Sequence, residues 1–193
     1  RESDILLELL NHYALHKIST KEELEANIIH ITDRIMIANV FNTWTRKTKQ
    51  SLLDATFDII EYAVKYKDVR FVVLDHLRLF LDYSRSDDER LAIESFIKQC
   101  VRLAVSYQIH IWLIVQPRKF DDQREIELHD LKGSANIEQD SHNVVLLHRI
   151  DDGEVPGLVR LKFPKVRSIS GSIGSCLLKF NLESRANYED YVG

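Results

Sequence analysis

The sequence predicts an α/β fold: a mostly parallel central sheet flanked by helices, with an antiparallel β extension toward the C-terminal end. Strand and helix patterns alternate as far as residue 116, and mostly strands follow. The apolar runs at 70–75 and 109–115 lack polar alternation, which is typical of parallel strands covered on both faces. The chain has 193 residues, enough for one domain with a sizeable core.

Before residue 70 we expect three helices, with a short strand between the second and the third. Residues 3–4 can cap the first helix. Thr20, with Glu23 three residues later, fits a capping box at the start of the second. The apolar run 36–41 predicts the strand, and Ser51 is expected to begin the third helix.

After the strand at 70–75, a long helix is expected at 88–107 and a second strand at 109–115. The polar stretch 117–138 predicts a loop. Further strands, joined by glycine-containing turns, are expected at 143–147, 158–163 and 176–180. The residues expected to point inward from the long helix are Leu91, Phe96, Cys100, Leu103 and Ala104.

The composition argues against several classes of protein. With a formal net charge of −4, any positive charge for nucleic acid must be concentrated in a few loops. Cys100 and Cys176 are far apart, which favours two buried, reduced thiols over a disulfide framework or a zinc site. The apolar runs are too short for a membrane span, and no GxxxxGK[ST] phosphate-binding motif occurs in the chain.

Polar residues follow both apolar strands at the edge where open α/β sheets bind ligands. Asp75 ends the first strand, as an aspartate that holds Mg²⁺ on a nucleotide does. Gln116 ends the second, where an amide could bond a terminal phosphate or an attacking water. Ordinary strand ends that cap the next turn would have the same pattern.

Basic residues gather at three later positions. Arg118, Lys119 and Arg124 lie in the loop after Gln116, although neighbouring acids dilute their charge. In the stretch 130–135, Lys132 lies beside Gly133 and small residues that let backbone amides approach a phosphate. Solvated surface cations would look the same.

Lys165 and Arg167 lie two residues apart, just after a predicted strand. That spacing points both side chains the same way in extended backbone, which suits a polyphosphate. Two exposed cations on a β turn are the alternative.

Taken in order, these segments resemble the motor domain of the hexameric replicative DNA helicases, and among them the Twinkle-like mitochondrial helicases and related phage primase-helicases. The resemblance covers roughly 70–188, while 1–69 match only in element order. No single piece is specific, and the shared order and spacing carry the resemblance. The stretches are 72–76, 113–119, 130–135 followed by 138–149, 165–167 and 174–180.

The resemblance implies a RecA-like P-loop NTPase core, of which residues 1–193 form a partial motor domain. Asp75 would hold Mg²⁺ through water, and Gln116 would sense the γ-phosphate of ATP. Arg167, with Lys165, would act as an arginine finger in the neighbouring subunit's nucleotide site.

The resemblance also implies binding residues. Arg149 and Phe180 would flank the nucleotide base. Single-stranded DNA would contact Arg118, Lys119, Lys132 and Gly133. The expected activity is ATP-driven 5′-to-3′ unwinding at a replication fork by a homo-oligomer, a hexameric ring. The expected location is the mitochondrion or another organelle nucleoid, with phage-infected or bacterial cytoplasm as the alternative.

The sequence departs from the family at two points. The phosphate-binding loop is missing, and Glu2 lies near the place of the catalytic glutamate, which is more readily expected before Arg1. The 193 residues alone are therefore expected not to hydrolyse ATP. The alternatives are a recombinase-type ATPase that forms filaments on DNA, and a degenerate ATPase domain that only binds DNA or a partner.

Overall fold

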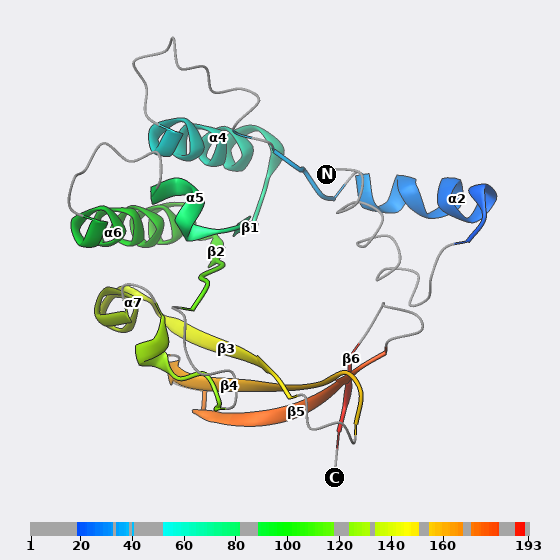
Figure 1. Cartoon of the computed structure of the whole chain (residues 1–193). Coiled ribbons are helices and arrows are strands. Elements are labelled where there is room, and N and C mark those ends of the chain that lie inside the picture. Colours follow the sequence, from blue (N-terminus) through cyan, green and yellow to red (C-terminus); the bar gives the residue numbers. More distant parts are fainter. Residues whose placement is uncertain are drawn as a thin grey trace. The chain divides into compact units, whose positions relative to one another are not determined.

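The computed structural model (Figure 1) forms two compact units, and each is described by itself. One unit comprises 1–38, 145–164 and 172–193, and the other comprises 39–144 and 165–171. The structure describes 19–32, 34–38, 40, 52–81, 89–117, 124–131, 134–150, 155–167, 171–181 and 188–191. For 28–32, 81, 134 and 188–190 only the backbone is described.

The larger unit contains a parallel pair of strands. β1 (Phe71–Leu74) pairs with β2 (His110–Leu113), with Phe71 opposite His110 and Leu74 opposite Leu113. This confirms the predicted parallel pairing. The described part of this unit includes the helices α4 (Leu52–Lys67), α5 (Leu77–Leu81), α6 (Glu89–Tyr107) and α7 (Ser134–Asp140), together with the 3₁₀ helix η1 (Leu128–Asp130).

The helix that precedes each of these two strands ends in the same backbone conformation. The residue after α4, Asp68, has φ 51°, and the residue after α6, Gln108, has φ 54°. A left-handed residue stops a helix and turns the chain out of it. The residue that follows each left-handed residue bonds back to the helix. Val69 N–H donates to the Ala63 carbonyl at 3.3 Å, and Ile109 N–H donates to the Ala104 carbonyl at 3.0 Å. Each helix thus delivers the chain directly into its strand.

Aromatic rings form the centre of this unit's core. Phe96 of α6 is 1% exposed, with its ring centroid 5.5 Å from that of Phe57 and 5.3 Å from that of Phe80. Cys100 and Leu103 are also buried, as expected. The inward prediction for Leu91 is wrong, because this first-turn side chain is 49% exposed.

One face of the β1–β2 pair is open, contrary to the prediction that both faces are covered. Phe71, Val73 and Trp112 alternate onto one face and are 66%, 65% and 54% exposed, whereas Leu74 on the other face is 6% exposed. The Phe71 ring stacks on His110 at 4.9 Å. An unbroken apolar run shows that each side chain can be buried. It does not show which neighbouring residues cover each face of the strand.

In the smaller unit, α2 (Lys21–Thr32) begins at the predicted cap. Glu23 N–H donates to the Thr20 hydroxyl oxygen at 3.2 Å, and Ser19 N–H donates to the Glu23 carboxylate at 3.2 Å. Two of the amides at the helix start are satisfied in this way.

The second sheet has the strand order β3 (Asn143–Arg149), β4 (Leu158–Val166), β5 (Gly174–Phe180), β6 (Tyr188–Asp190). β4 pairs antiparallel with β5, and β5 with β6, which confirms the antiparallel extension. Gly157 has φ 80° in the turn before β4, a conformation that glycine adopts without strain.

Several predicted elements differ from the structure. Residues 36–38 form no strand, and Val40 is helical, because a short apolar run does not distinguish the two periods. The polar stretch 117–138 contains η1 and most of α7, contrary to the predicted loop. α5 and β6 are additional to the predicted elements, and the expected cap at 3–4 lies outside the described residues. Among the helices described, none combines the length and apolar character needed to cross a membrane.

Candidate functional site

Asp75 and Gln116 lie at the same edge of the parallel pair. Leu74 is registered with Leu113, and the pairing continues as Ile114 N–H donates to the Leu74 carbonyl at 3.0 Å. Leu77 N–H then donates to the Ile114 carbonyl at 2.9 Å. Asp75 therefore leaves the sheet beside the segment that carries Gln116, and both residues are exposed. The predicted juxtaposition of the two strand ends is confirmed.

The donor chemistry at this edge fits a cation whose coordination shell is completed by phosphate oxygens and water. Across the described residues, no cluster of three or more His, Cys, Asp or Glu could hold a metal ion. Mg²⁺ is commonly held by one or two carboxylates, with phosphate oxygens and water completing its shell. A single exposed carboxylate such as Asp75 fits that pattern.

His76 is a feature of this edge that no sequence pattern singles out. Its Nδ1 atom is buried and has no hydrogen-bond partner within the part of the chain that the structure describes. It directly follows Asp75 and precedes the buried Leu77, which begins α5. Buried polar atoms in proteins are nearly always paired, so this nitrogen distinguishes the turn after β1 from an ordinary strand end.

Lys165 and Arg167 both reach the C-terminal end of α7. Lys165 Nζ donates to the Glu138 carbonyl, and the Arg167 guanidinium donates to the Gln139 carbonyl. The last carbonyls of a helix lack partners within it and carry partial negative charge, so cations bind there. The prediction that the two side chains point the same way is confirmed.

The backbone of Arg167 is also held by hydrogen bonds. Arg167 N–H donates to the His142 carbonyl at 3.1 Å and to the Asn143 side-chain oxygen at 3.2 Å. Partial burial, followed by the nearby charge of Arg167, lowers the pKa of Lys165. The two cations therefore form a fixed, concentrated positive group on one helix end.

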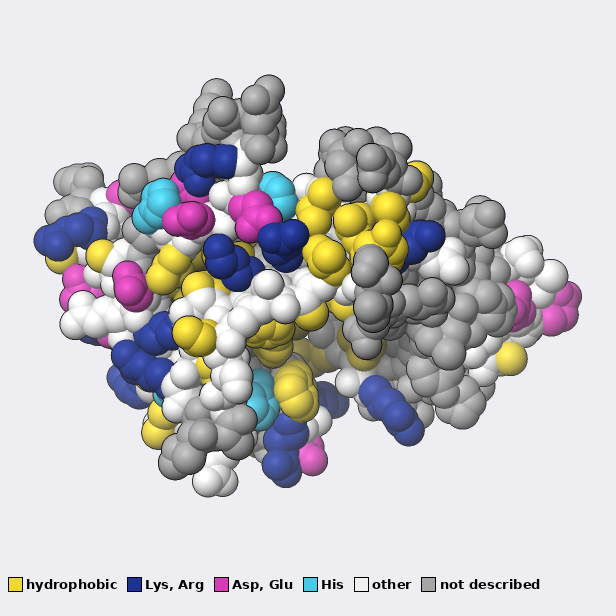
Figure 2. Space-filling view, turned by 90° about the horizontal axis from the view of Figure 1, so that it is seen from below, with side chains coloured by type: hydrophobic (Ala, Val, Ile, Leu, Met, Phe, Trp, Pro, Cys, Tyr) yellow, Lys and Arg dark blue, Asp and Glu magenta, His cyan; other side chains and the backbone are white. Residues whose placement is uncertain are grey.

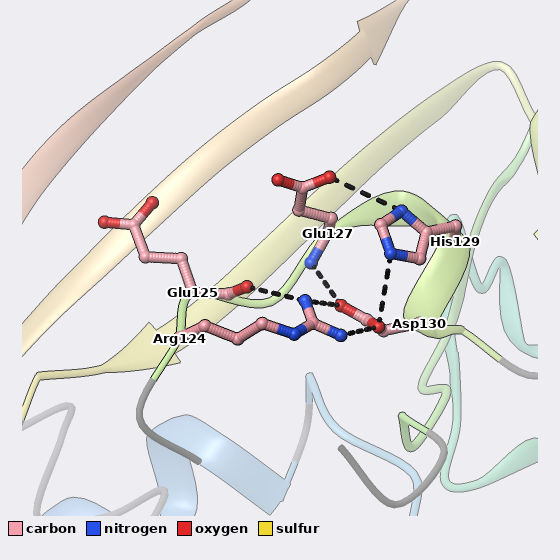
Figure 3. Close-up of polar contacts among 5 residues, drawn as sticks. All are labelled: Arg124, Glu125, Glu127, His129 and Asp130. Carbon is pink, nitrogen blue, oxygen red and sulfur yellow. Dashed lines mark hydrogen bonds and ion pairs between the residues drawn. The ribbon is translucent and has the colours of Figure 1, made fainter. Parts of the chain in front are cut away.

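A second group of charged residues lies at 124–130 (Figure 3). The sequence did not predict that its members pair with one another. The Arg124 guanidinium donates to both carboxylate oxygens of Asp130, with Nη1 at 2.8 Å from Oδ2. Glu127 N–H also donates to Asp130 Oδ2 at 2.8 Å, closing a capping box over η1. The Asp130 side chain is 6% exposed, and the bonds from Arg124 and then Glu127 lower its pKa to about 2.

His129 completes this group, with Nε2 at 3.6 Å from Asp130 Oδ1 and Nδ1 at 3.4 Å from Glu127 Oε2. The sequence predicts Arg124 to be one of several loop cations. The structure shows it held by a buried carboxylate six positions away. A pairing over that distance has no periodic signature, although an Arg and an Asp flanking a short polar run are visible in the sequence.

The other predicted site residues have different outcomes. Arg149 ends β3 and Phe180 ends β5, two strands separated by β4 in one sheet. The predicted DNA contacts Arg118, Lys119, Lys132 and Gly133 lie outside the described residues. On the face shown in Figure 2, Lys and Arg side chains lie among acidic, histidine and hydrophobic ones rather than forming one continuous basic surface.

Comparison with known proteins identifies one matching family. The model of the DnaB-like helicase C terminal domain matches residues 7–187. This match begins well before residue 70, where the stretches of the sequence resemblance begin.

Curated relatives agree with that match. The DNA helicase/primase of Enterobacteria phage T3 is 26% identical over 119 residues, 58% of this chain and 21% of the relative. The replicative DNA helicase DnaB of Mycobacterium intracellulare is 32% identical over 87 residues, 44% of this chain and 15% of the relative. A probable plasmid replicative DNA helicase of Chlamydia psittaci is 32% identical over 114 residues, 56% and 24% of the two chains. The chain thus spans a quarter or less of the length of these relatives.

Solved structures share the fold. One solved ATPase domain has a TM-score of 0.74 at 18% identity, covering 100% of this chain and 72% of that one. A DnaB-like replicative helicase has a TM-score of 0.70 at 18% identity, covering 96% and 48%. A KaiC-like protein of Pyrococcus horikoshii has a TM-score of 0.59 at 14% identity, covering 100% and 71%. These likenesses establish the predicted RecA-like ATPase fold.

Proposed function

Because the chain belongs to the DnaB-like helicase C-terminal domain family, we propose that it is part of an ATP-driven replicative helicase that moves along single-stranded DNA and separates the duplex 5′ to 3′. Within that protein, residues 1–193 form part of one RecA-like motor domain. The observation that carries the proposal is the parallel β1–β2 register, which brings Asp75 and Gln116 to one sheet edge.

At that edge, Asp75 holds Mg²⁺ through water, and Gln116 bonds the γ-phosphate of ATP or the attacking water. Mg²⁺ held there by Asp75 would supply positive charge close to the phosphates during transfer. The exposure of both side chains and the main-chain bonds that fix their strand ends support these roles. Arg149 and Phe180, at the ends of two strands of one sheet, flank the nucleotide base.

Lys165 and Arg167 complete the nucleotide site of a neighbouring subunit in a homo-oligomer, a hexameric ring. Their hydrogen-bond partners in the isolated chain are neutral carbonyls. Exchanging a carbonyl for a phosphate oxygen strengthens the interaction, because the cation then faces a full negative charge instead of the partial charge of a carbonyl. Hydrolysis then depends on assembly, since each site needs residues from two subunits.

Single-stranded DNA contacts Arg118, Lys119, Lys132 and Gly133. Lysine, arginine and backbone amides bind phosphates without reading base identity, as a motor that steps along any strand requires. The named relatives come from a phage and from bacteria, which does not support the expected mitochondrial origin or a Twinkle-specific assignment. They fit the alternative, phage-infected or bacterial cytoplasm.

No GxxxxGK[ST] motif occurs within these 193 residues. We therefore propose that the chain alone does not hydrolyse ATP and that the complete protein supplies the phosphate-binding loop and the catalytic glutamate. The test measures ATP hydrolysis by the complete protein with and without single-stranded DNA, followed by a duplex-unwinding assay.

Hydrolysis stimulated by DNA, together with unwinding, supports the helicase. Stimulated hydrolysis with filament formation and no unwinding would point to a recombinase-type ATPase instead. A folded, assembled protein that hydrolyses nothing in either condition would make it a degenerate binding module.

A further inference from the structure

Arg167 is held both through its backbone and through its side chain. Its main-chain N–H donates to the His142 carbonyl at 3.1 Å and to the side-chain oxygen of Asn143 at 3.2 Å. Its guanidinium donates to the Gln139 carbonyl. Because the two sets of bonds are independent, the backbone bonds can hold Arg167 in place while its side chain exchanges a carbonyl for a phosphate.

Asn143 follows a short connection between α7 and β3 that is fixed by its own hydrogen bonds. Ser141 N–H donates to the Ile137 carbonyl at 3.1 Å, and the Ser141 hydroxyl donates to the same carbonyl. Ile137 and Val144, which lie before and after this connection, are each 6% exposed. Buried residues thus anchor the chain on both sides of Asn143, and core packing of this kind leaves little freedom of movement.

The neutral charge of the side chain at position 143 also fits a role beside two cations. Burial, followed by the charge of Arg167, lowers the pKa of Lys165, while the carboxylates of Glu138 and Asp140 act in the opposite direction. An amide oxygen accepts the Arg167 N–H without adding a further negative charge. Such a charge would compete with a phosphate for the two cations.

We propose that Asn143 is a positioning residue for the Lys165–Arg167 cation pair: its side-chain oxygen holds the backbone N–H of Arg167, so that both cations are presented to a neighbouring subunit's nucleotide in a fixed orientation. This inference rests on the proposed function, because it assumes that the two cations act on that nucleotide. Charges that are oriented before the reaction stabilise the transition state at no further cost of reorganisation. Asn143 acts through Arg167 and is not itself a catalytic residue.

The first experiment compares Asn143→Leu with Asn143→Asp in the complete protein. Both side chains are close to asparagine in size, but only aspartate keeps an oxygen that can accept the Arg167 N–H. Asn143→Leu is expected to lower kcat for ATP by roughly tenfold, the factor that one well-placed hydrogen bond represents. Its affinity for a fluorescent ATP analogue is expected to stay at the wild-type value. Asn143→Asp is expected to have a kcat between those of Asn143→Leu and wild type, because it keeps the acceptor but adds a competing charge.

Three results of this experiment would overturn the proposal. The first is an unchanged kcat in Asn143→Leu. The second is a loss in Asn143→Asp as large as in Asn143→Leu, because the acceptor oxygen would then have no part in turnover. The third is a fall in nucleotide affinity as large as the fall in kcat, which would make Asn143 a binding or purely structural residue.

Asn27→Leu is the matched control. It makes the same substitution at an asparagine whose side chain donates to the Glu23 carbonyl at 2.8 Å within α2. This variant is expected to hydrolyse ATP at the wild-type rate. Circular dichroism and size-exclusion chromatography establish that each variant folds and assembles. Asn143→Ala, which removes the same acceptor with a smaller side chain, replaces Asn143→Leu if the latter fails to fold.

The second experiment mixes variant subunits, because a positioning residue for the cation pair must act across the subunit boundary. Asn143→Leu leaves the subunit's own Asp75 intact and affects the cations that it offers to its neighbour. Asp75→Asn does the reverse. Rings assembled from both variants are expected to hydrolyse ATP faster than rings of either one, since some sites then combine an intact Asp75 with a correctly held cation pair.

Arg167→Ala mixed with Asp75→Asn is the reference for this experiment. If Arg167→Ala complements Asp75→Asn and Asn143→Leu does not, Asn143 does not act through the cation pair and the proposal is wrong. If neither variant complements Asp75→Asn, the site shared between subunits is refuted, and that failure belongs to the proposed function. Wild-type protein that hydrolyses no ATP would likewise refute the proposed function itself.

Discussion

The guanidinium of Arg167 donates to the carbonyl oxygen of Gln139, in the last turn of α7. Lys165 makes the equivalent bond to Glu138, one residue earlier. The residues proposed to act on a neighbour's nucleotide are thus held, in the single chain, by the helix that follows the 130–133 segment. Among the described residues, the partners that an incoming phosphate would displace from these two side chains are neutral carbonyls.

Arg167→Ala in the complete protein is expected to reduce ATP turnover by roughly 10³- to 10⁵-fold, the loss typical of a missing arginine finger. DNA affinity is expected to stay close to wild type, because Arg167 lies outside the proposed DNA contacts. Stability should fall by only about 0.3–1 kcal/mol, the value of one cation at a helix C-terminus. Arg70→Ala, another exposed arginine, is the control and should retain turnover. Equal losses of turnover and DNA binding would count against the assignment.

Asp75→Asn is expected to lower ATP hydrolysis by roughly 10- to 100-fold, as loss of an outer-shell metal partner does. The fold should be unaffected, since the side chain is exposed. Asp68→Asn supplies the comparison at the opposite end of the same strand. The measurement is a Mg²⁺ titration of steady-state hydrolysis, in which Asp75→Asn should require more Mg²⁺. A variant with an unchanged Mg²⁺ requirement would remove Asp75 from the metal site.

Asp130 makes the stability of the protein depend on acidity. Its pKa is lowered from 3.8 to about 2 by the bonds from Arg124 and from Glu127 N–H. A depressed carboxyl pKa contributes stability that is fully present above the unfolded value and is lost as pH falls through the folded value. The stability advantage of wild type over Asp130→Asn should therefore shrink between about pH 4 and pH 2. Urea unfolding across that range measures it, and a constant difference would contradict the expectation.

The two cysteines should react at very different rates with a disulfide reagent. Cys100 is 7% exposed, and burial raises the pKa of its thiol to about 12, from an ordinary value of 9.0. Its thiolate fraction near pH 8 is roughly a thousandfold below that of an ordinary thiol, because each pKa unit is a factor of ten. Cys176 is exposed, contrary to the expectation that both thiols are buried, and it should react promptly. Cys176→Ser should leave a single slow reaction that denaturant accelerates; a fast reaction in that folded variant would show that Cys100 is accessible.

Much of the fold followed from local patterns. The helical spacing of Phe96, Cys100 and Leu103 predicted α6 and its buried side, because that spacing repeats once per turn. The two apolar runs predicted β1, β2 and their parallel pairing, because strands of parallel sheets are typically near-continuous apolar runs without polar alternation. Predicted roles for Asp75, Gln116, Arg149 and Phe180 came from resemblance and remain proposals.

Short elements could not be predicted from these patterns. α7 has seven residues, too few to display a helical period, and its polar sequence fits a loop equally well. The run around Met36 is apolar but belongs to no described strand. The exposure of Phe71, Val73 and Trp112 could not be predicted from the sequence either, because a residue's type does not determine which neighbours contact it.

The order of motifs in the sequence was sufficient to predict the family, the parallel pairing and the common edge of Asp75 and Gln116. Each of these depends on residues close in sequence or on strand direction. The partners of Arg124, Lys165 and Arg167 were decided by folding alone. Hydrogen bonds to backbone carbonyls have no sequence signature, and an ion pair between loop residues needs a turn that only the packed chain supplies. Both charged groups, on α7 and at η1, are products of that packing.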